Sequence, residues 1–344
     1  MHTIADISEK ELYERLKNIL NETANSPESG VHLGIGDDAA VMETSPHKHL
    51  ISSCDIMIEG RHFDLQYTNP RDLGFKALAV NISDVASMGG TPRWAMVSLA
   101  LPGETTLLFW EEFYRGMREL AEQAGVAIVG GDTTSSSKIV VDVSIMGEAK
   151  PSQIISRSNA SPGEKILVTG SLGSSAAGLS WLQSKVSLGC LTHEEAKPLV
   201  QAHLQPLPRF REAYFIREVN PGAMIDLSDG LAAGVDGICA SSGVGARINY
   251  SSLPYLPVTL ELSRRTGFPL EDWILYGGED FELLFTVPKS KSLEIAEELT
   301  KITNTPATVI GEILPAKEGM HLIFDGGEKI RLETGRVYRH FTDS

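Results

Sequence analysis

Short apolar runs alternate with helically periodic segments along the whole chain, and this alternation restricts the fold most. Runs such as 94–101 and 165–169 are typical of buried strands. Segments such as 109–124 and 231–241 have the apolar spacing of helices. Because each half of the chain contains both kinds, we expect the α/β or α+β class.

The length of 344 residues indicates two domains. Proline and glycine interrupt the sequence at 151 and 162–163, so we expect domains 1–150 and 151–344. Further strands are expected at 50–53, 126–129, 139–145, 224–226, within 276–287 and at 307–313, and further helices at 9–20, 72–88, 175–183, 194–204 and 293–302. No apolar run approaches the length of a membrane-spanning helix.

The net charge of −15 excludes several kinds of partner. Non-specific nucleic-acid binding and anionic membrane surfaces both need a basic chain, so neither is expected. An acidic chain can still bind phosphates when divalent cations stand between them. The three distant cysteines form no disulfide or zinc pattern, and the N-terminus lacks a signal-peptide core, so a cytoplasmic protein is expected.

Acidic residues recur where glycine-flanked strands are expected to end. These segments are 34–38, 54–55, 130–134, 225–230 and 277–280. Carboxylate oxygens suit Mg²⁺, and so many acids packed together without cations would repel one another. The set therefore predicts a magnesium site, although any single member could instead be a turn residue or a helix cap.

Asp84 and the missing motifs add two further constraints. Asp84 comes late in an expected helix, on one face with Lys76 and Val80 and beside Asn81; taken alone, it is expected to be solvated. The sequence has no Walker A loop, no GxGxxG, no protein-kinase motif set, no zinc spacing and no GxSxG. If the protein uses ATP, carboxylates and metal ions must hold the phosphates.

Taken in order, several segments resemble the thiamine-monophosphate kinase family, which belongs to the superfamily of aminoimidazole ribonucleotide synthetase. They are GIGDDAAV (34–41), CDIMIEGRHF (54–63), GFKALAVNISDVASMGGTPRW (74–94), GGDTT (130–134), SRSNASPGE (156–164), VTGSLGSSAAGL (168–179), IDLSDGL (225–231), GGEDFELLF (277–285) and GRVYRHF (335–341). The resemblance implies a two-domain fold, and a homodimer whose N-terminal strands build a β-barrel. It also implies an active site near the cleft between the domains.

The resemblance also implies residue roles. The Mg²⁺ ligands would be Asp38, Ser53, Asp55, Asp84, Asp132, Asp226 and Asp229; ATP would contact Gly131, Asp132, Arg157 and Ser228; thiamine monophosphate would contact His62, Glu279 and Tyr338. Each of these could have a structural role instead, such as a surface histidine, an ion pair, a helix cap or an anchor for the tail. Cys54 stands where the family commonly has Thr, and no role is assigned to it.

The implied reaction is ATP-dependent phosphorylation of thiamine monophosphate to thiamine diphosphate, the last step of thiamine diphosphate biosynthesis. It would proceed by direct in-line transfer assisted by several Mg²⁺ ions, with no general base assigned. One alternative keeps the superfamily but takes a purine precursor as substrate. Another is a non-catalytic nucleotide-binding protein, although all six aspartate positions are filled.

Overall fold

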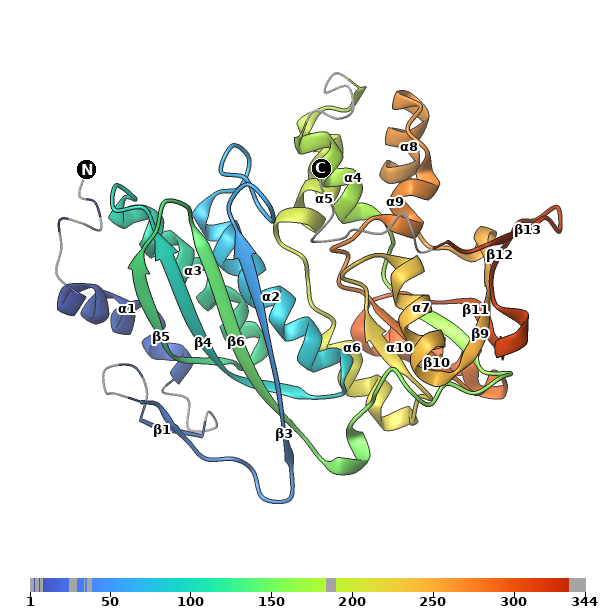
Figure 1. The fold of residues 1–344 in the computed structure, drawn as a ribbon, viewed down its shortest axis with the longest axis horizontal. Helices are drawn as coiled ribbons and strands as arrows, with labels where there is room; N and C mark the ends of the chain where they lie inside the picture. The colour runs from blue at the N-terminus through green and yellow to red at the C-terminus, as the bar shows by residue number, and fades with distance from the viewer. Residues whose placement is uncertain are drawn as a thin grey trace. The chain divides into compact units, whose positions relative to one another are not determined.

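The computed structural model describes residues 3, 6, 9–24, 30–33, 35, 39–183 and 190–333. The chain divides into two compact units, which we call the first unit (1–86 and 90–152) and the second unit (87–89 and 153–344). Figure 1 labels most of the elements of both units. No helix in the described ranges is long and apolar enough to cross a bilayer.

The first unit is a four-stranded sheet with helices on one face. In sheet order the strands are β3 (His49–Ile58), β6 (Val140–Ala149), β4 (Thr91–Leu101) and β5 (Ala127–Ser135). β6 pairs antiparallel with β3 and β4, whereas β4 and β5 run parallel. The helices are α1 (Glu9–Ala24), α2 (Pro70–Ser87) and α3 (Leu107–Ala124), and β1 (Val31–Leu33) pairs with β2 (Val41–Met42) separately (Figure 1).

Helix α2 is buried on all sides over 73–83, as its apolar sequence predicts. It packs against α3 at two glycines. A Cβ atom on Gly74 would lie 1.8 Å from the carbonyl oxygen of Phe113, and one on Gly116 would lie 1.8 Å from that of Arg71. The two helices therefore meet backbone to backbone, which only glycine allows at these positions.

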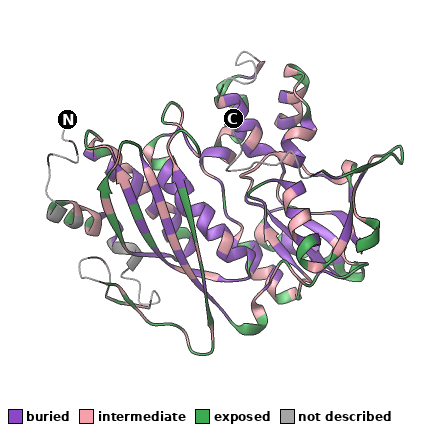
Figure 2. Cartoon of the chain, viewed as in Figure 1, coloured by how far each residue is buried: buried purple, intermediate pink, exposed green. Residues whose placement is uncertain are grey.

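The sheet face opposite α2 is partly open. The Ser53 side chain contacts α2, so the alternating neighbours Leu50, Cys54 and Ile56 face the other way, and all three are exposed (Figure 2). Met96, on the central strand β4, pairs in register with Ser144, which in turn pairs with Cys54, so Met96 shares their face; it is 40% exposed. We call Leu50, Cys54, Ile56 and Met96 the open-face residues.

The second unit contains a seven-stranded mixed sheet. Its order is β13 (Lys329–Arg331), β12 (Met320–Ile323), β9 (Val244–Asn249), β11 (Ala307–Pro315), β7 (Lys165–Thr169), β10 (Leu283–Val287) and β8 (Met224–Asp226). Only β9 and β12 pair in parallel among these strands. The helices are α4 (Ser174–Leu182), α5 (His193–Leu204), α6 (Phe210–Ile216), α7 (Leu231–Ser242), α8 (Pro257–Thr266), α9 (Leu270–Tyr276) and α10 (Ser292–Thr303).

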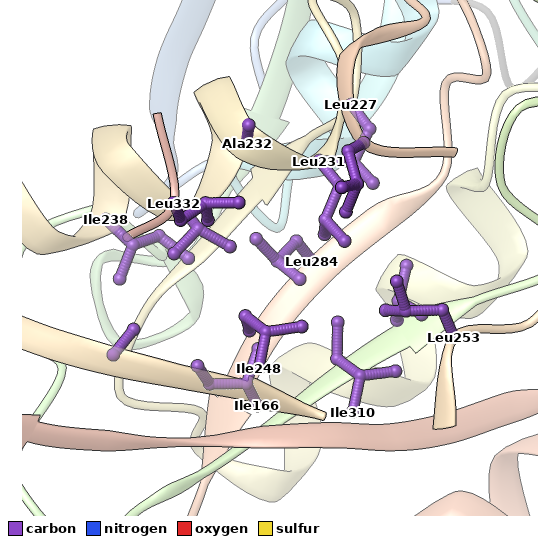
Figure 3. Close-up of a cluster of buried hydrophobic side chains, with 14 of the residues drawn as sticks. Ile166, Leu227, Leu231, Ala232, Ile238, Ile248, Leu253, Leu284, Ile310 and Leu332 are labelled. Atoms are coloured by element: carbon purple, nitrogen blue, oxygen red, sulfur yellow. The ribbon is translucent and has the colours of Figure 1, made fainter. Parts of the chain in front are cut away.

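Helix α7 packs on one face of this sheet. Its residues Leu231 and Ile238 belong to one buried cluster with Ile248 of β9 and Leu284 of β10 (Figure 3). Leu227, which precedes the helix, enters the same cluster. The apolar residues on both sides therefore fix the short connection between β8 and α7 in place.

The expectation of mixed strands and helices is confirmed, and the largely antiparallel pairing makes the fold α+β. Two local expectations are wrong: the segments after 53 and after 129 do not leave their strands, so Asp55 lies inside β3 and Asp132 inside β5. Strand β5 continues because Gly131 pairs with Val97 of β4, where a Cβ atom would lie 1.9 Å from the Val97 carbonyl oxygen. Among the described strands the first sheet stays open, with β3 and β5 at its edges.

Candidate functional site

In the first unit, polar contacts join strand β3 to helix α2. Ser53 Oγ donates to Asp84 Oδ2 at 2.6 Å, and the backbone N–H of Asp55 donates to Asn81 Oδ1 at 3.1 Å. The fully buried Asn81 also donates to the Ala77 carbonyl oxygen at 3.0 Å. The expectation that Asp84, taken alone, is simply solvated is therefore wrong: it is half-buried and receives a hydrogen bond from another candidate residue.

His62 follows β3 and has a defined protonation pattern. The backbone N–H of Ile58 donates to His62 Nδ1 at 3.0 Å, so Nδ1 acts as an acceptor. In a neutral imidazole the other nitrogen, Nε2, then carries the proton. The half-buried ring thus has an N–H donor at Nε2, which suits recognition of a phosphate or another acceptor group.

Asp132 lies exposed on β5, and its Oδ1 accepts from the backbone N–H of Thr133 at 2.9 Å. The fully buried Tyr114 of α3 hydrogen-bonds to Thr133, although burial is the larger influence and raises the pKa of the Tyr114 hydroxyl. Tyr114 therefore anchors the strand directly behind Asp132. Its sequence position does not indicate this role, because an aromatic residue at helical spacing is normally a core residue.

In the second unit, two acidic segments lie side by side. The N–H of Glu279 donates to the Ser228 carbonyl oxygen at 2.7 Å, and that of Phe281 donates to Leu227 at 3.0 Å. These bonds prolong the β8–β10 pairing, in which Asp226 faces Leu283. Asp226 and Leu227 are buried, whereas Ser228 and Asp229 are exposed at the start of α7.

The segment 277–282 has an unusual backbone. Glu279 has φ 66° and Phe281 has φ 50°, both in the left-handed region that non-glycine residues rarely adopt. The side chain of Phe281 is buried, and the Ser228 and Leu227 carbonyls hold the two N–H groups. Strain of this kind is found where the surrounding structure imposes a conformation, often at functional sites.

Glu279 and Asp280 are adjacent but take different roles. Asp280 accepts from the backbone N–H groups of Gly173 at 2.6 Å and Ser175 at 3.1 Å, at the start of α4. Burial raises the pKa of Asp280 to about 7, against the lowering effect of these N–H groups. The glycine- and serine-rich turn before α4 is therefore capped by the chain's own carboxylate.

Glu282 anchors the segment 277–282 through buried polar contacts. It accepts from Arg209 Nε at 2.7 Å and Nη2 at 2.6 Å, and from Thr169 Oγ1 at 2.6 Å. Burial alone would lower the pKa of Arg209, but the Glu282 carboxylate outweighs burial and raises it. Nothing in the local sequence pairs Arg209 with Glu282, because the two residues are far apart in the chain.

Arg157 lies between the start of β8 and the end of α7. The N–H of Met224, the first residue of β8, donates to the carbonyl oxygen of the preceding Ser156 at 3.2 Å, and the Arg157 carbonyl accepts from Ser242 Oγ, at the last residue of α7, at 3.1 Å. The Arg157 side chain is exposed. Asp38 and Tyr338 lie outside the described residues.

The described donors fit Mg²⁺ by their chemistry. Within the described ranges, no three His, Cys, Asp or Glu side chains come together as a preformed metal site. Ser53, Asp55 and Asp84 at β3 and α2, and Asp226 and Asp229 before α7, offer oxygen atoms only. Mg²⁺ prefers such ligands and commonly takes one or two protein carboxylates, completing its shell with phosphate oxygens and water.

Chemical labelling of the cysteines can test the buried position of Cys239 in the second unit. All three are free, and burial raises the pKa of Cys239, on α7, to about 11. Since the thiolate is the reactive form, Cys239 should resist iodoacetamide at pH 8 in the native protein. Peptide mass spectrometry should find it alkylated only after denaturation in urea; labelling of the native protein would contradict the buried position.

Known protein families match both halves of the chain. Residues 36–149 match the family described as AIR synthase related protein, N-terminal domain, and residues 161–322 match AIR synthase related protein, C-terminal domain. The chain is 37% identical to thiamine-monophosphate kinase of Bacillus subtilis (strain 168), over 91% of this chain and 94% of that protein.

Two solved structures are similar over most of their length. Thiamine-monophosphate kinase from Stenotrophomonas maltophilia K279a has a TM-score of 0.81 and 33% identity, covering 91% of this chain and 96% of that chain. A structure described as "AaThiL complexed with AMPPCP and TMP" has a TM-score of 0.75 and 32% identity, covering 97% and 99%. The identification from sequence motifs, and with it the prediction of a kinase, is confirmed: the chain belongs to the thiamine-monophosphate kinase family.

Proposed function

We propose that the protein transfers the γ-phosphoryl group of ATP to thiamine monophosphate, giving thiamine diphosphate and ADP. The observation that carries the proposal is the similarity, over nearly the whole chain, to AaThiL complexed with AMPPCP and TMP. The reaction would be the last step of thiamine diphosphate biosynthesis, in the cytoplasm.

The proposed residue roles follow the candidate site. Asp38, Ser53, Asp55, Asp84, Asp132, Asp226 and Asp229 would hold several Mg²⁺ ions; Gly131, Asp132, Arg157 and Ser228 would contact ATP; His62, Glu279 and Tyr338 would contact thiamine monophosphate. Residues 1–150 would serve ATP and Mg²⁺ binding and dimerisation, and residues 151–344 would form the C-terminal α+β domain.

The proposed reaction depends more on how the two reactants are positioned than on proton transfer. The acceptor is a phosphate oxygen that is largely anionic at neutral pH, because the second pKa of a phosphate monoester is about 6. Bound Mg²⁺ would supply neutralising charge between the two polyanions. The Nε2 donor of His62 and the backbone-fixed segments 226–229 and 277–282 would orient the reactants for direct in-line transfer. A trapped phosphoenzyme would contradict this mechanism.

The test is ADP release with ATP and Mg²⁺, using thiamine monophosphate, thiamine or formylglycinamidine ribonucleotide as acceptor. Turnover with thiamine monophosphate alone, with thiamine diphosphate as product, is expected. Turnover only with the purine precursor would move the protein to the synthetase branch. No turnover with any of the three would favour a non-catalytic nucleotide-binding protein.

We also propose that a second copy covers the open-face residues of the first sheet, as a dimeric β-barrel would require. An exposed methionine on the central strand β4 and exposed Leu50 and Ile56 on β3 support this placement. Several large apolar side chains exposed on one face of a sheet are typical of an interface.

Light scattering should therefore give twice the chain mass of 37.3 kDa for the wild type. Met96→Glu should shift the protein toward the monomer, because burying a charge in an apolar interface is costly. Ile302→Glu is the matched control, since Ile302 is 67% exposed on α10 of the second unit. A Met96→Glu protein with unchanged mass would rule out this face as the interface.

A further inference from the structure

His203 of helix α5 is buried in the second unit and has no part in the roles proposed so far. Its Nδ1 atom lies 3.3 Å from Glu279 Oε2 and 3.1 Å from Ser175 Oγ. The His203 side chain is 3% exposed, whereas that of Glu279 is 31% exposed. One end of the Glu279 carboxylate therefore meets a buried ring, while the residue itself remains accessible to a ligand.

The contact with Glu279 favours a proton on Nδ1. An ionised carboxylate can only accept hydrogen bonds, so His203 binds Glu279 Oε2 in the form that carries a proton on Nδ1. The Ser175 hydroxyl can accept or donate and thus tolerates either arrangement. Hydrogen bonds to charged groups are stronger than neutral ones, and a buried ring has few other conformations, so the contact restrains the carboxylate.

The backbone of Glu279 is already held in place. Its N–H is bonded to Ser228, and its φ of 66° belongs to a segment that Arg209 and Glu282 brace. A buried contact with His203, on a helix more than seventy positions earlier in the chain, restrains the Glu279 side chain as well.

We infer that His203 is a positioning residue, which holds the Glu279 carboxylate toward the cationic, amine-bearing rings of the acceptor. This inference rests on the proposed function and on the proposed role of Glu279. A thiazolium ring carries a fixed positive charge and an aminopyrimidine offers N–H donors, so both complement an oriented carboxylate. His203 should therefore influence binding of the acceptor and leave ATP binding unaffected.

The test compares two substitutions at His203. His203→Leu removes the donor and should raise the KM for thiamine monophosphate at least about tenfold, the loss expected for one hydrogen bond to a charged group. The KM for ATP and kcat should change little. His203→Asn places an amide donor close to the position of Nδ1 and should restore most of the affinity. His193→Leu is the matched control on the same helix, because exposed His193 packs only edge-on to Trp181 among its described ring contacts.

A double-mutant cycle separates positioning from a merely structural role. In a Glu279→Gln background, His203→Leu should add little to the KM for thiamine monophosphate, because the group that it positions has lost its charge. Fully additive effects, an unchanged KM in His203→Leu, or a rise in both KM values together with lower thermal stability would overturn the inference.

A spectroscopic readout does not depend on turnover. In protein labelled with ¹⁵N-histidine, the Nδ1 resonance of His203, assigned by its loss in His203→Asn, should move when Glu279 is changed to Gln. An unmoved resonance would overturn the inference even if His203→Leu failed to fold. If the wild type does not phosphorylate thiamine monophosphate, the proposed function fails, and this resonance still decides whether His203 and Glu279 interact.

Discussion

Changing Asp229 to Asn should lower kcat for phosphorylation of thiamine monophosphate by about 100-fold or more, the usual loss when one electrostatic group at a reacting centre is removed. Asp229 is exposed directly before α7, where the N-terminal end of the helix also favours phosphate oxygens. Asn keeps the shape of the side chain but removes the charge that would bind Mg²⁺. Initial rates of ADP release at saturating substrates measure the effect.

Stability should not follow activity in this variant. Exposed substitutions usually change the free energy of unfolding by about 0.5 kcal/mol or less, so the thermal midpoint should stay close to that of the wild type. Asp325→Asn is the matched control, because Asp325 is an exposed aspartate in the turn between β12 and β13. If Asp229→Asn kept wild-type turnover, Asp229 would be no metal ligand, and the proposed role of the segment 226–229 would need revision.

Buried strands bounded by turn residues were predictable from local sequence. The expected strands at 165–169 and 224–226 coincide with β7 and β8, because an apolar run followed by glycine or by a polar turn has few other conformations. The short strands β12 and β13 were not predicted, since runs of four and three residues become strands only through pairing with β9 and with each other. Helices α8 and α9, which begin at or after a proline, were also not predicted.

In the candidate site, too, some features were predictable from the local sequence, whereas others depend on contacts between distant residues. The acidic segments can be recognised in the sequence, and in the structure 226–229 and 277–282 lie side by side. Apart from the family resemblance, the local sequence does not distinguish Glu279 from Asp280, because the difference is made by the N–H groups of Gly173 and Ser175, more than a hundred positions away. His203 and Arg209 stayed unnoticed for the same reason: each contacts its partner only in the folded second unit.

The second large effect concerns stability. Arg209→Met should lower the free energy of unfolding by about 3–5 kcal/mol, because it leaves the carboxylate of Glu282 buried without its partner. The Glu282 side chain is only 4% exposed, and Arg209 donates hydrogen bonds to it from two nitrogen atoms. Equilibrium urea unfolding measures the loss. Arg265→Met is the matched control: its pair with Glu261 is 2.6 Å long but 40% and 42% exposed, so its removal should leave the free energy of unfolding close to that of the wild type.

The double variant Arg209→Met/Glu282→Gln decides what the pair contributes. If the loss comes from an unpaired buried charge, removing that charge should recover much of the stability, because replacing both members of a buried ion pair is often nearly neutral. Activity need not recover with it, since Glu282 also accepts from Thr169 and braces the segment that presents Glu279. A double variant that regains stability but keeps a raised KM for thiamine monophosphate would show that the pair positions the acceptor site. One no more stable than Arg209→Met would mean that packing of the arginine side chain, and not its charge, holds this part of the fold.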